Sequence, residues 1–250
     1  GLKIGRRSAD LVLIDFLGQI VGMRRRLHRY PTPDGAVAFV REALPDLAAT
    51  LPAGARGRIG GLGVAMPFQL WNWVHALGAP QDEMDSWRHR DIQADLAALT
   101  GLPVVIRNDA TAACAAELVL GKGERPRDFL YFYCGTFIGG GLVLNGQLFT
   151  GRSGNAGGVG PMPVPGGDGR MGRLFDAASM SVLADAMEAA GESSAHLWEQ
   201  HAEWHVSGPV LERWLDTAAE GLAWATLSAA ALTEIEAVLI DGWMPGSVRA

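Results

Sequence analysis

The sequence predicts an α/β protein whose chain forms two lobes with a cleft between them. Strand-like runs alternate with helical segments, and β-hairpins open each half of the chain. A length of 250 residues is enough for two lobes that share a cleft. We therefore expect an N-terminal α/β lobe over residues 1–108 and a C-terminal α/β lobe over residues 109–250.

The composition is that of a globular chain and argues against several classes of partner. The net charge of −6 disfavours a nucleic-acid surface, because such domains are usually basic. The 33 glycines indicate many tight turns or close approaches of the backbone. We find no signal peptide and no apolar run long enough for a membrane helix, so we expect a cytoplasmic protein without a membrane partner.

Two local features resemble binding sites but have simpler interpretations. The basic residues of 24–29 lie in a strand-like run, so a solvated sheet edge is favoured over a nucleic-acid patch. Cys114 and Cys134 lie in core-like segments and provide neither a disulfide framework nor a metal knuckle.

The first half begins with strands and continues with helices. Three strand-like runs open the chain, at residues 1–8, 9–15 and 20–23. Asp34 is expected to cap a helix over residues 36–51. Residues 58–66 are typical of a buried strand, which Pro67 closes.

Aromatic and capping residues occupy the next segment. Trp71 and Trp73 flank a polar residue and could stack on a sugar ring, but packing within a lobe is favoured. Asp91 is a good N-cap for a helix that Gly101 ends.

The middle of the chain carries the clearest secondary-structure signals. A strand over residues 102–107 passes directly into a helix over residues 109–120, which Gly121 ends. A three-stranded meander follows, at residues 129–133, 140–144 and 147–150. Asn145-Gly146 between the last two strands predicts a tight hairpin turn.

The last third is predominantly helical. Helices are predicted at residues 177–190, 194–205 and 209–232, followed by a short strand at residues 236–240. His201 and His205 are four residues apart and would share a helix face, as metal ligands often do. Glu203 points elsewhere and no third ligand clusters with them, so we favour solvated surface.

Asp109 is the main candidate for chemistry. It lies at a strand-to-helix junction and is followed by the glycine-rich segment 135–141, an arrangement that suggests a phosphoryl-transfer cleft. The alternative for Asp109 alone is a helix N-cap, which aspartate fills well, and the two roles are compatible.

Four motifs resemble the ROK family of repressors, open reading frames and sugar kinases, which belongs to the actin-like ATPase superfamily. The motifs are GLGVAMP (61–67), LPVVIRNDATAACAAE (102–117), GTFIGGGLVLNGQLFTG (135–151) and EAVLIDG (236–242). Together they are specific, although a single glycine run would be weak evidence. The resemblance implies a two-lobed actin-like ATPase (ribonuclease H-like) fold with substrate between the lobes.

The resemblance also implies roles for individual residues. Asp109 would accept the proton of a sugar hydroxyl, and Asn108 would hydrogen-bond neighbouring hydroxyls. The other implied sugar-site residues are Pro67, Asn155 and Gly157. The implied phosphate-binding residues are Gly135, Thr136, Gly139 and Gly140, whose backbone N–H groups would face phosphate oxygens.

The chain departs from the family pattern on the nucleotide side. The family's kinases open with a DxGGT-type phosphate loop, but here Lys3 replaces the carboxylate and Arg6 and Arg7 fill the glycine positions. A turn with those side chains should not admit a triphosphate in the usual way. Phe137 also stands where the second phosphate motif has glycine.

The family's sugar-and-zinc segment is eroded as well. Gly158 stands for a sugar-binding glutamate, Pro161 for a zinc-binding histidine and Phe175 for a second glutamate, and the stretch 169–175 keeps its glycines but no cysteine. We therefore predict that zinc is absent and that sugar specificity is changed or lost. The chain also ends soon after Gly242, where the family continues.

Three functions remain open. The favoured one is the sugar-sensing effector domain of a ROK-type transcriptional regulator, with no required cofactor. DNA would be bound only through a winged-helix head domain absent from this chain, and we expect a homodimer or tetramer. The alternative is a sugar kinase that uses ATP and Mg²⁺ with Asp109 as base. The third is a scaffold that dimerises and binds no ligand.

Overall fold

The chain divides into two compact units. The computed structural model describes residues 1–74, 78–121, 126–166, 170–198, 204–206 and 208–249. Contacts group the chain into unit 1, Gly1–Asp109, and unit 2, Ala110–Ala250. The sequence prediction placed the boundary one residue earlier, between residues 108 and 109.

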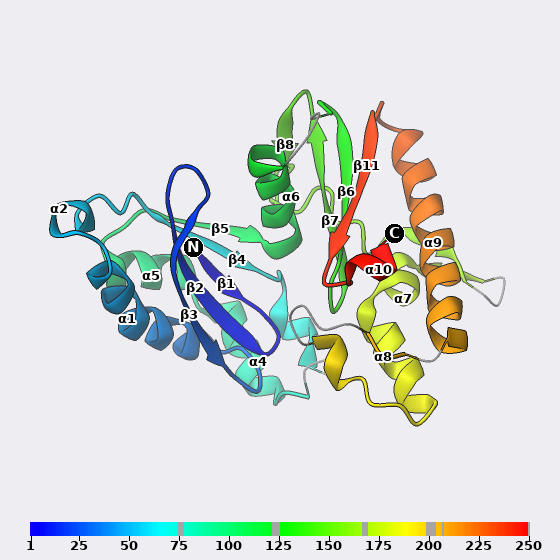
Figure 1. Ribbon diagram of the computed structural model, residues 1–250, viewed down its shortest axis with the longest axis horizontal. Coiled ribbons are helices and arrows are strands. Elements are labelled where there is room, and N and C mark those ends of the chain that lie inside the picture. Colours follow the sequence, from blue (N-terminus) through cyan, green and yellow to red (C-terminus); the bar gives the residue numbers. More distant parts are fainter. Residues whose placement is uncertain (75–77, 122–125, 167–169, 199–203, 207, 250) are drawn as a thin grey trace. The chain divides into compact units, whose positions relative to one another are not determined.

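Unit 1 is built on a mixed five-stranded sheet (Figure 1). The strands lie in the order β3 (Ile20–Leu27), β2 (Ser8–Ile14), β1 (Leu2–Ile4), β4 (Leu62–Met66) and β5 (Val104–Asn108). The first three strands pair antiparallel, whereas β4 is parallel to both β1 and β5. The carboxyl ends of β1, β4 and β5 therefore meet at one edge of the sheet.

Helices pack against this sheet to form the core of unit 1. They are α1 (Pro33–Ala49), α2 (Ala53–Arg56), the 3₁₀ helix η1 (Leu70–Asn72), α4 (Gln81–His89) and α5 (Ile92–Thr100). Helix α1 packs on β2 and on α5, and α5 packs on β5. Alternate residues of the central strands are buried beneath them, among them Leu2, Ile4, Leu11 and Val64. This period-two burial is the pattern of a sheet with one face in a core.

The capping prediction is right for α5 and wrong for α1. Asp91 accepts a hydrogen bond from the Ala94 N–H, at 3.0 Å. The N-cap of α1 is Thr32, whose hydroxyl accepts from the Gly35 N–H at 3.1 Å, and not Asp34. Pro33 explains the difference, because its fixed φ and missing N–H suit the first helical position. The helix therefore starts before Asp34, which lies in its first turn.

Strand β3 is the edge strand of its sheet, which agrees with the favoured interpretation of the basic cluster. Arg25 forms an ion pair with Asp10, and Arg26 forms one with Glu42. The tryptophans also follow the favoured interpretation, since Trp71 and Trp73 pack against the core of unit 1. The predicted strand at residues 58–66 is shorter than expected and begins at Leu62.

Unit 2 is built on a four-stranded sheet with helices on both faces (Figure 1). Its strands lie in the order β11 (Ala237–Gly242), β6 (Phe129–Cys134), β7 (Ile138–Leu144) and β8 (Gln147–Phe149). A separate two-stranded sheet pairs β9 (Pro163–Pro165) with β10 (Met171–Arg173). The helices are α6 (Asp109–Leu120), α7 (Leu174–Ala178), α8 (Met180–Ala189), the 3₁₀ helix η2 (Ala195–Trp198), α9 (Gly208–Ala230) and α10 (Gly246–Arg249).

The two faces of β6 serve two different cores. Phe129 and Tyr131 share a cluster with Cys114 of α6, whereas Leu130 and Phe132 join the core formed with α7, α8 and α9. Successive side chains of a strand point to opposite faces, so the continuous apolar run of β6 is required by burial on both sides. Burial also raises the pKa of the Cys114 and Cys134 thiols to about 12.

The predicted helix 109–120 and the meander are confirmed, and the helical C-terminal part is partly corrected. Asn145 and Gly146 both have positive φ, at 55° and 71°, as the tight hairpin turn requires. The predicted helix 177–190 is interrupted at Ser179, which has extended backbone angles. The predicted helix 194–205 is a 3₁₀ turn of four residues within the described part.

The histidine pair cannot be followed in full, because His201 and Glu203 lie outside the described residues. The His205 N–H donates to Nε2 of His196 at 3.2 Å. Within the described part of the chain, no three His, Cys, Asp or Glu side chains gather as a metal site would require. Among the same residues, no helix combines the length and apolar character needed to cross a bilayer.

The cap of α1 can be tested by stability. Thr32→Ala removes the hydroxyl that accepts from Gly35 and should lower the free energy of unfolding by about 1 kcal/mol. Asp34→Ala leaves that hydrogen bond intact and should lower the free energy of unfolding by less than Thr32→Ala does. Denaturant unfolding followed by circular dichroism compares the two variants. If Asp34→Ala lowered the free energy of unfolding more than Thr32→Ala does, Asp34 and not Thr32 would be the functional cap.

Candidate functional site

The carboxyl edge of the sheet in unit 1 holds the first group of candidate residues. Met66 of β4 is in register with Asn108 of β5, so Pro67 and Asp109 follow these strands at the same edge. Strand β1 ends there too, and it continues into the turn at Gly5. Ligands of α/β proteins commonly bind where parallel strands end. The structure thus brings together Pro67, Asn108 and Asp109.

Asn108 and Asp109 are held in place by regular secondary structure. Asn108 is the last residue of β5, and Asp109 is the first residue of α6. Both side chains are half-buried. An amide can donate to and accept from sugar hydroxyls, and a carboxylate can accept from them, so the pair suits a polyhydroxyl ligand.

The turn between β1 and β2 is closed by its own hydrogen bonds. The Gly5 N–H donates to the Ser8 carbonyl at 2.8 Å. The Arg7 carbonyl accepts from the His28 N–H at 2.9 Å, and Nε2 of His28 lies 3.0 Å from the Gly5 carbonyl. Lys3 lies in β1, between Asp10 and Ala65 of the neighbouring strands. This turn is ordered as a tight hairpin whose Gly5 N–H is already used.

The turn between β6 and β7 forms the second group, in unit 2. It comprises Gly135, Thr136 and Phe137. The Gly135 and Thr136 carbonyls accept from the N–H groups of Met180 and Ser181, each at 3.1 Å. These two N–H groups belong to the first turn of α8, where an anion would otherwise find unpaired donors. The turn thus caps α8 with its own backbone.

Ser179 ties this turn to the helices behind it. Its side chain is fully buried, and Oγ accepts from the Ile138 N–H at 3.0 Å. Its carbonyl accepts from the indole N–H of Trp214 at 3.2 Å. Sequence reasoning missed this residue because a serine within a predicted helix carries no signal for such a role.

Two of the four predicted phosphate-binding residues lie within strand β7 and not in the turn. A Cβ on Gly139 would come within 2.6 Å of the Ala110 Cβ, and one on Gly140 within 2.4 Å of the Tyr131 carbonyl oxygen. A Cβ on Gly141 would lie 2.7 Å from the Cys114 sulfur. The three glycines therefore let α6 and neighbouring backbone approach β7 closely. Gly135 and Thr136 remain as turn residues.

Two departures from the family pattern contact each other. The rings of Phe137 and Phe175 pack edge to face, with centroids 6.1 Å apart. Gly160 lies directly behind, because a Cβ there would come within 2.4 Å of the Phe175 ring. An aromatic pair thus borders the turn where the resembled pattern has a glycine and a carboxylate.

The loop with Asn155 and Gly157 lies beside the same sheet in unit 2. Gly157 has a φ of 79°, and a Cβ there would meet the Leu142 nitrogen at 2.7 Å. The exposed Asn155 accepts from the Gly158 N–H through its carbonyl at 3.2 Å. Of the predicted sugar-site residues, Asn155 and Gly157 thus lie in unit 2, whereas Pro67, Asn108 and Asp109 lie in unit 1.

The carboxyl end of β11 carries a further carboxylate. The Tyr131 hydroxyl donates to Oδ2 of Asp241 at 2.9 Å. Burial, together with this hydrogen bond, raises the pKa of the Tyr131 hydroxyl above its usual value. Gly242 follows with a φ of 144°, and the nearby Cys134 carbonyl oxygen leaves no room for a side chain. Glycine at this position lets β11 pair with β6 up to its last residue.

The donor set does not fit the zinc site that the resemblance implies. Both cysteines of the chain lie elsewhere, in α6 and β6, and their thiols are buried and protonated at neutral pH. The segment from Gly158 to Phe175 contains no histidine or cysteine. The absence of zinc stays a prediction that metal analysis can test.

Comparison with known proteins places this chain in a family. The model of the ROK family matches residues 1–244. The chain belongs to the ROK family. Its mixed α/β architecture agrees with the two-lobed, actin-like fold of that family. The solved structure of ROK hexokinase from Thermus thermophilus has a TM-score of 0.69 at 22% identity and covers 100% of this chain and 84% of that one.

Curated relatives of the ROK chain include both enzymes and a repressor. Glucokinase from Streptomyces coelicolor is 31% identical over 161 residues, which are 62% of this chain and 46% of that protein. Xylose repressor from Bacillus subtilis is 25% identical over 164 residues, which are 66% of this chain and 42% of that protein. The matched stretches thus span less than half the length of these relatives, and family membership alone does not decide between the two roles.

The packing role of the glycines in β7 can be tested by substitution. Gly141→Ala places a Cβ against Cys114 and should lower the free energy of unfolding by about 1–3 kcal/mol. Gly172→Ala is the matched control, since Gly172 is also a strand glycine of unit 2 and its added Cβ would make ordinary contact at 3.9 Å. Equal stability of the two variants would contradict the close-packing explanation.

Proposed function

We propose that this chain is the sugar-binding effector domain of a ROK-type transcriptional regulator. It binds a sugar or sugar derivative at Asn108 and Asp109 and does not phosphorylate it efficiently. DNA binding belongs to a head domain outside this chain. The proposal rests on a contrast between two sides of the ancestral site: the sugar-binding pair is retained, whereas the nucleotide side is altered.

The altered nucleotide side is the observation that carries the proposal. In unit 1, the first turn holds Arg6 and Arg7 and uses its Gly5 N–H internally. In unit 2, Phe137 stands where the family pattern has glycine, and its ring packs edge to face on Phe175. Phosphoryl transfer requires donors aimed at the phosphate oxygens and a carboxylate to hold Mg²⁺. Lys3 stands where the family pattern has that carboxylate.

In a sensing domain, Asp109 acts as a hydrogen-bond acceptor for sugar hydroxyls and Asn108 fixes the orientation of the ring. A ligand can change the state of a regulator only by binding one conformation more tightly than another. The ROK fold has two lobes, so their relative movement is the conformational change that we propose the sugar biases.

The alternative is a sugar kinase. The retained Asn108-Asp109 pair and the similarity to glucokinase from Streptomyces coelicolor favour it. In this reaction the sugar hydroxyl oxygen attacks the γ-phosphorus of ATP, Asp109 takes the hydroxyl proton and ADP leaves. The kinase would need ATP and Mg²⁺, whereas the sensing domain needs neither. A scaffold without any ligand is the remaining alternative.

Calorimetric titration with glucose and xylose tests the sugar site directly. At least one sugar should bind, and Asp109→Asn should weaken it by about 10-fold to 100-fold, because a hydrogen bond to a charged group contributes about 1.5–3 kcal/mol. Asp82→Asn is the matched control, since Asp82 is an exposed carboxylate on α4. It should leave the affinity unchanged.

Two results would contradict the proposal. If the folded protein bound no sugar of a wider panel, the scaffold alternative would be favoured. Tight binding of ATP with Mg²⁺ that stabilises the protein more than any sugar does would favour the kinase.

A further inference from the structure

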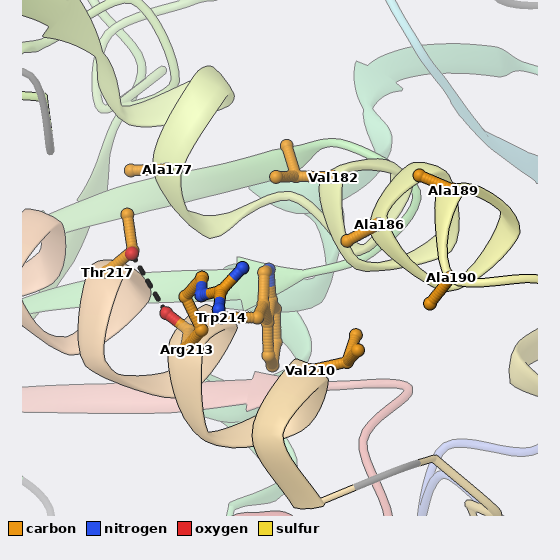
Figure 2. A pocket seen from close by; sticks show the side chains of 9 residues that line it. All are labelled: Ala177, Val182, Ala186, Ala189, Ala190, Val210, Arg213, Trp214 and Thr217. Atoms are coloured by element: carbon orange, nitrogen blue, oxygen red, sulfur yellow. Dashed lines mark hydrogen bonds between the residues drawn. The ribbon is translucent and has the colours of Figure 1, made fainter.

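Unit 2 contains a pocket that is distinct from the residues of the proposed sugar site. It lies between α8 and α9, with Ala177 of α7 at one end, and has a volume of about 350 Å³ (Figure 2). That volume falls within the range of small-molecule sites, which is roughly 300–1,000 Å³. The pocket and its walls lie entirely within one unit.

The walls of the pocket are mainly apolar and small. Helix α8 contributes Val182, Ala186 and Ala189, and its C-cap residue Ala190 follows them. Helix α9 contributes Val210 and the Trp214 indole (Figure 2). Alanine side chains leave the space between the helices open. The Trp214 indole is almost fully buried and its N–H is bonded to the Ser179 carbonyl, so the part of the ring that lines the pocket is apolar.

Arg213 is the one charged residue among the described residues that line the pocket (Figure 2). Its guanidinium is exposed and forms no ion pair or hydrogen bond with the described part of the chain. The Thr217 hydroxyl donates to the Arg213 carbonyl at 2.9 Å, so its proton is not available to a ligand. A cation beside an apolar cavity favours a ligand with an apolar body and one anionic group.

We propose that this pocket binds a small amphipathic carboxylate. Its flat aromatic or short aliphatic body packs between the alanines of α8 and the indole of Trp214, and its carboxylate pairs with Arg213. A sugar is a poor occupant, because its hydroxyl groups would be buried without partners at a cost of about 1–3 kcal/mol each. This site differs from the proposed sugar site in its position in the fold and in the class of ligand that it binds.

The pocket is connected to the turn between β6 and β7 by hydrogen bonds. The Trp214 indole donates to the Ser179 carbonyl, and the Ser179 hydroxyl accepts from the Ile138 N–H next to Phe137. A ligand that packs on Trp214 therefore contacts a residue whose partner, Ser179, supports this turn.

Calorimetric titration of the full chain with 1-naphthylacetate tests the proposal, with the uncharged 1-naphthylacetamide as the matched ligand. The acid should bind saturably at one site per chain. Arg213→Met should weaken binding of the acid by about tenfold or more, as expected for the loss of a hydrogen bond to a charged group. Binding of the amide should not change. Arg41→Met is the control variant, since Arg41 is an exposed arginine on α1.

A second variant separates pocket binding from binding at the surface. Ala186 is exposed in the wall of the pocket, so Ala186→Phe should fill the space without disturbing the core, and it should abolish binding of both ligands. Circular dichroism establishes that each variant is folded.

Three results would overturn the proposal. The first is no saturation of the wild-type chain by about 10 mM acid, where even a Kd near 1 mM would be detected. The second is acid binding that survives both Arg213→Met and Ala186→Phe. The third is a change of oligomeric state on Ala186→Phe in the absence of binding, measured by sedimentation, which would make the pocket an interface between copies.

Discussion

The hydrogen bonds of Ser179 are the constraint on which the altered half of the site depends. This buried residue separates α7 from α8. Its hydroxyl accepts from the Ile138 N–H, and its carbonyl accepts from the Trp214 indole N–H. The break also lets the first N–H groups of α8 meet the carbonyls of Gly135 and Thr136. An unmade hydrogen bond in a buried site costs about 1–3 kcal/mol, so this arrangement is well determined.

The two groups of candidate residues, one in each unit, differ in how much of the family pattern they keep. At the carboxyl edge of the sheet in unit 1, Asn108 and Asp109 supply an amide and a carboxylate, groups that can hydrogen-bond hydroxyls. In unit 2, the carbonyls of Gly135 and Thr136 accept from the first N–H groups of α8, and Phe137 and Phe175 form an aromatic pair beside this turn. This pattern is the basis of our proposal that the chain binds a sugar without efficient phosphoryl transfer.

Signals between neighbouring residues predicted the turns and helix caps of the fold. The arrangement of the candidate site depends instead on contacts between residues that are distant in the sequence. Asn145-Gly146 and the cap at Asp91 were predictable because each needs only its neighbours in sequence. The packing of Gly141 on α6 was not predictable, because a glycine run has the same appearance whether it admits a phosphate or a helix. The contact between Phe137 and Phe175 joins residues 38 positions apart, and the hydrophobic periodicity of helices and strands cannot reveal such a contact.

Transfer of labelled γ-phosphate from ATP is the measurement that tests the central claim most directly. With Mg²⁺ and each sugar that binds, the wild-type chain should produce no labelled sugar above the level of a protein-free blank. Sugar-dependent transfer by the wild-type chain that is abolished in Asp109→Asn would contradict the account and establish a kinase.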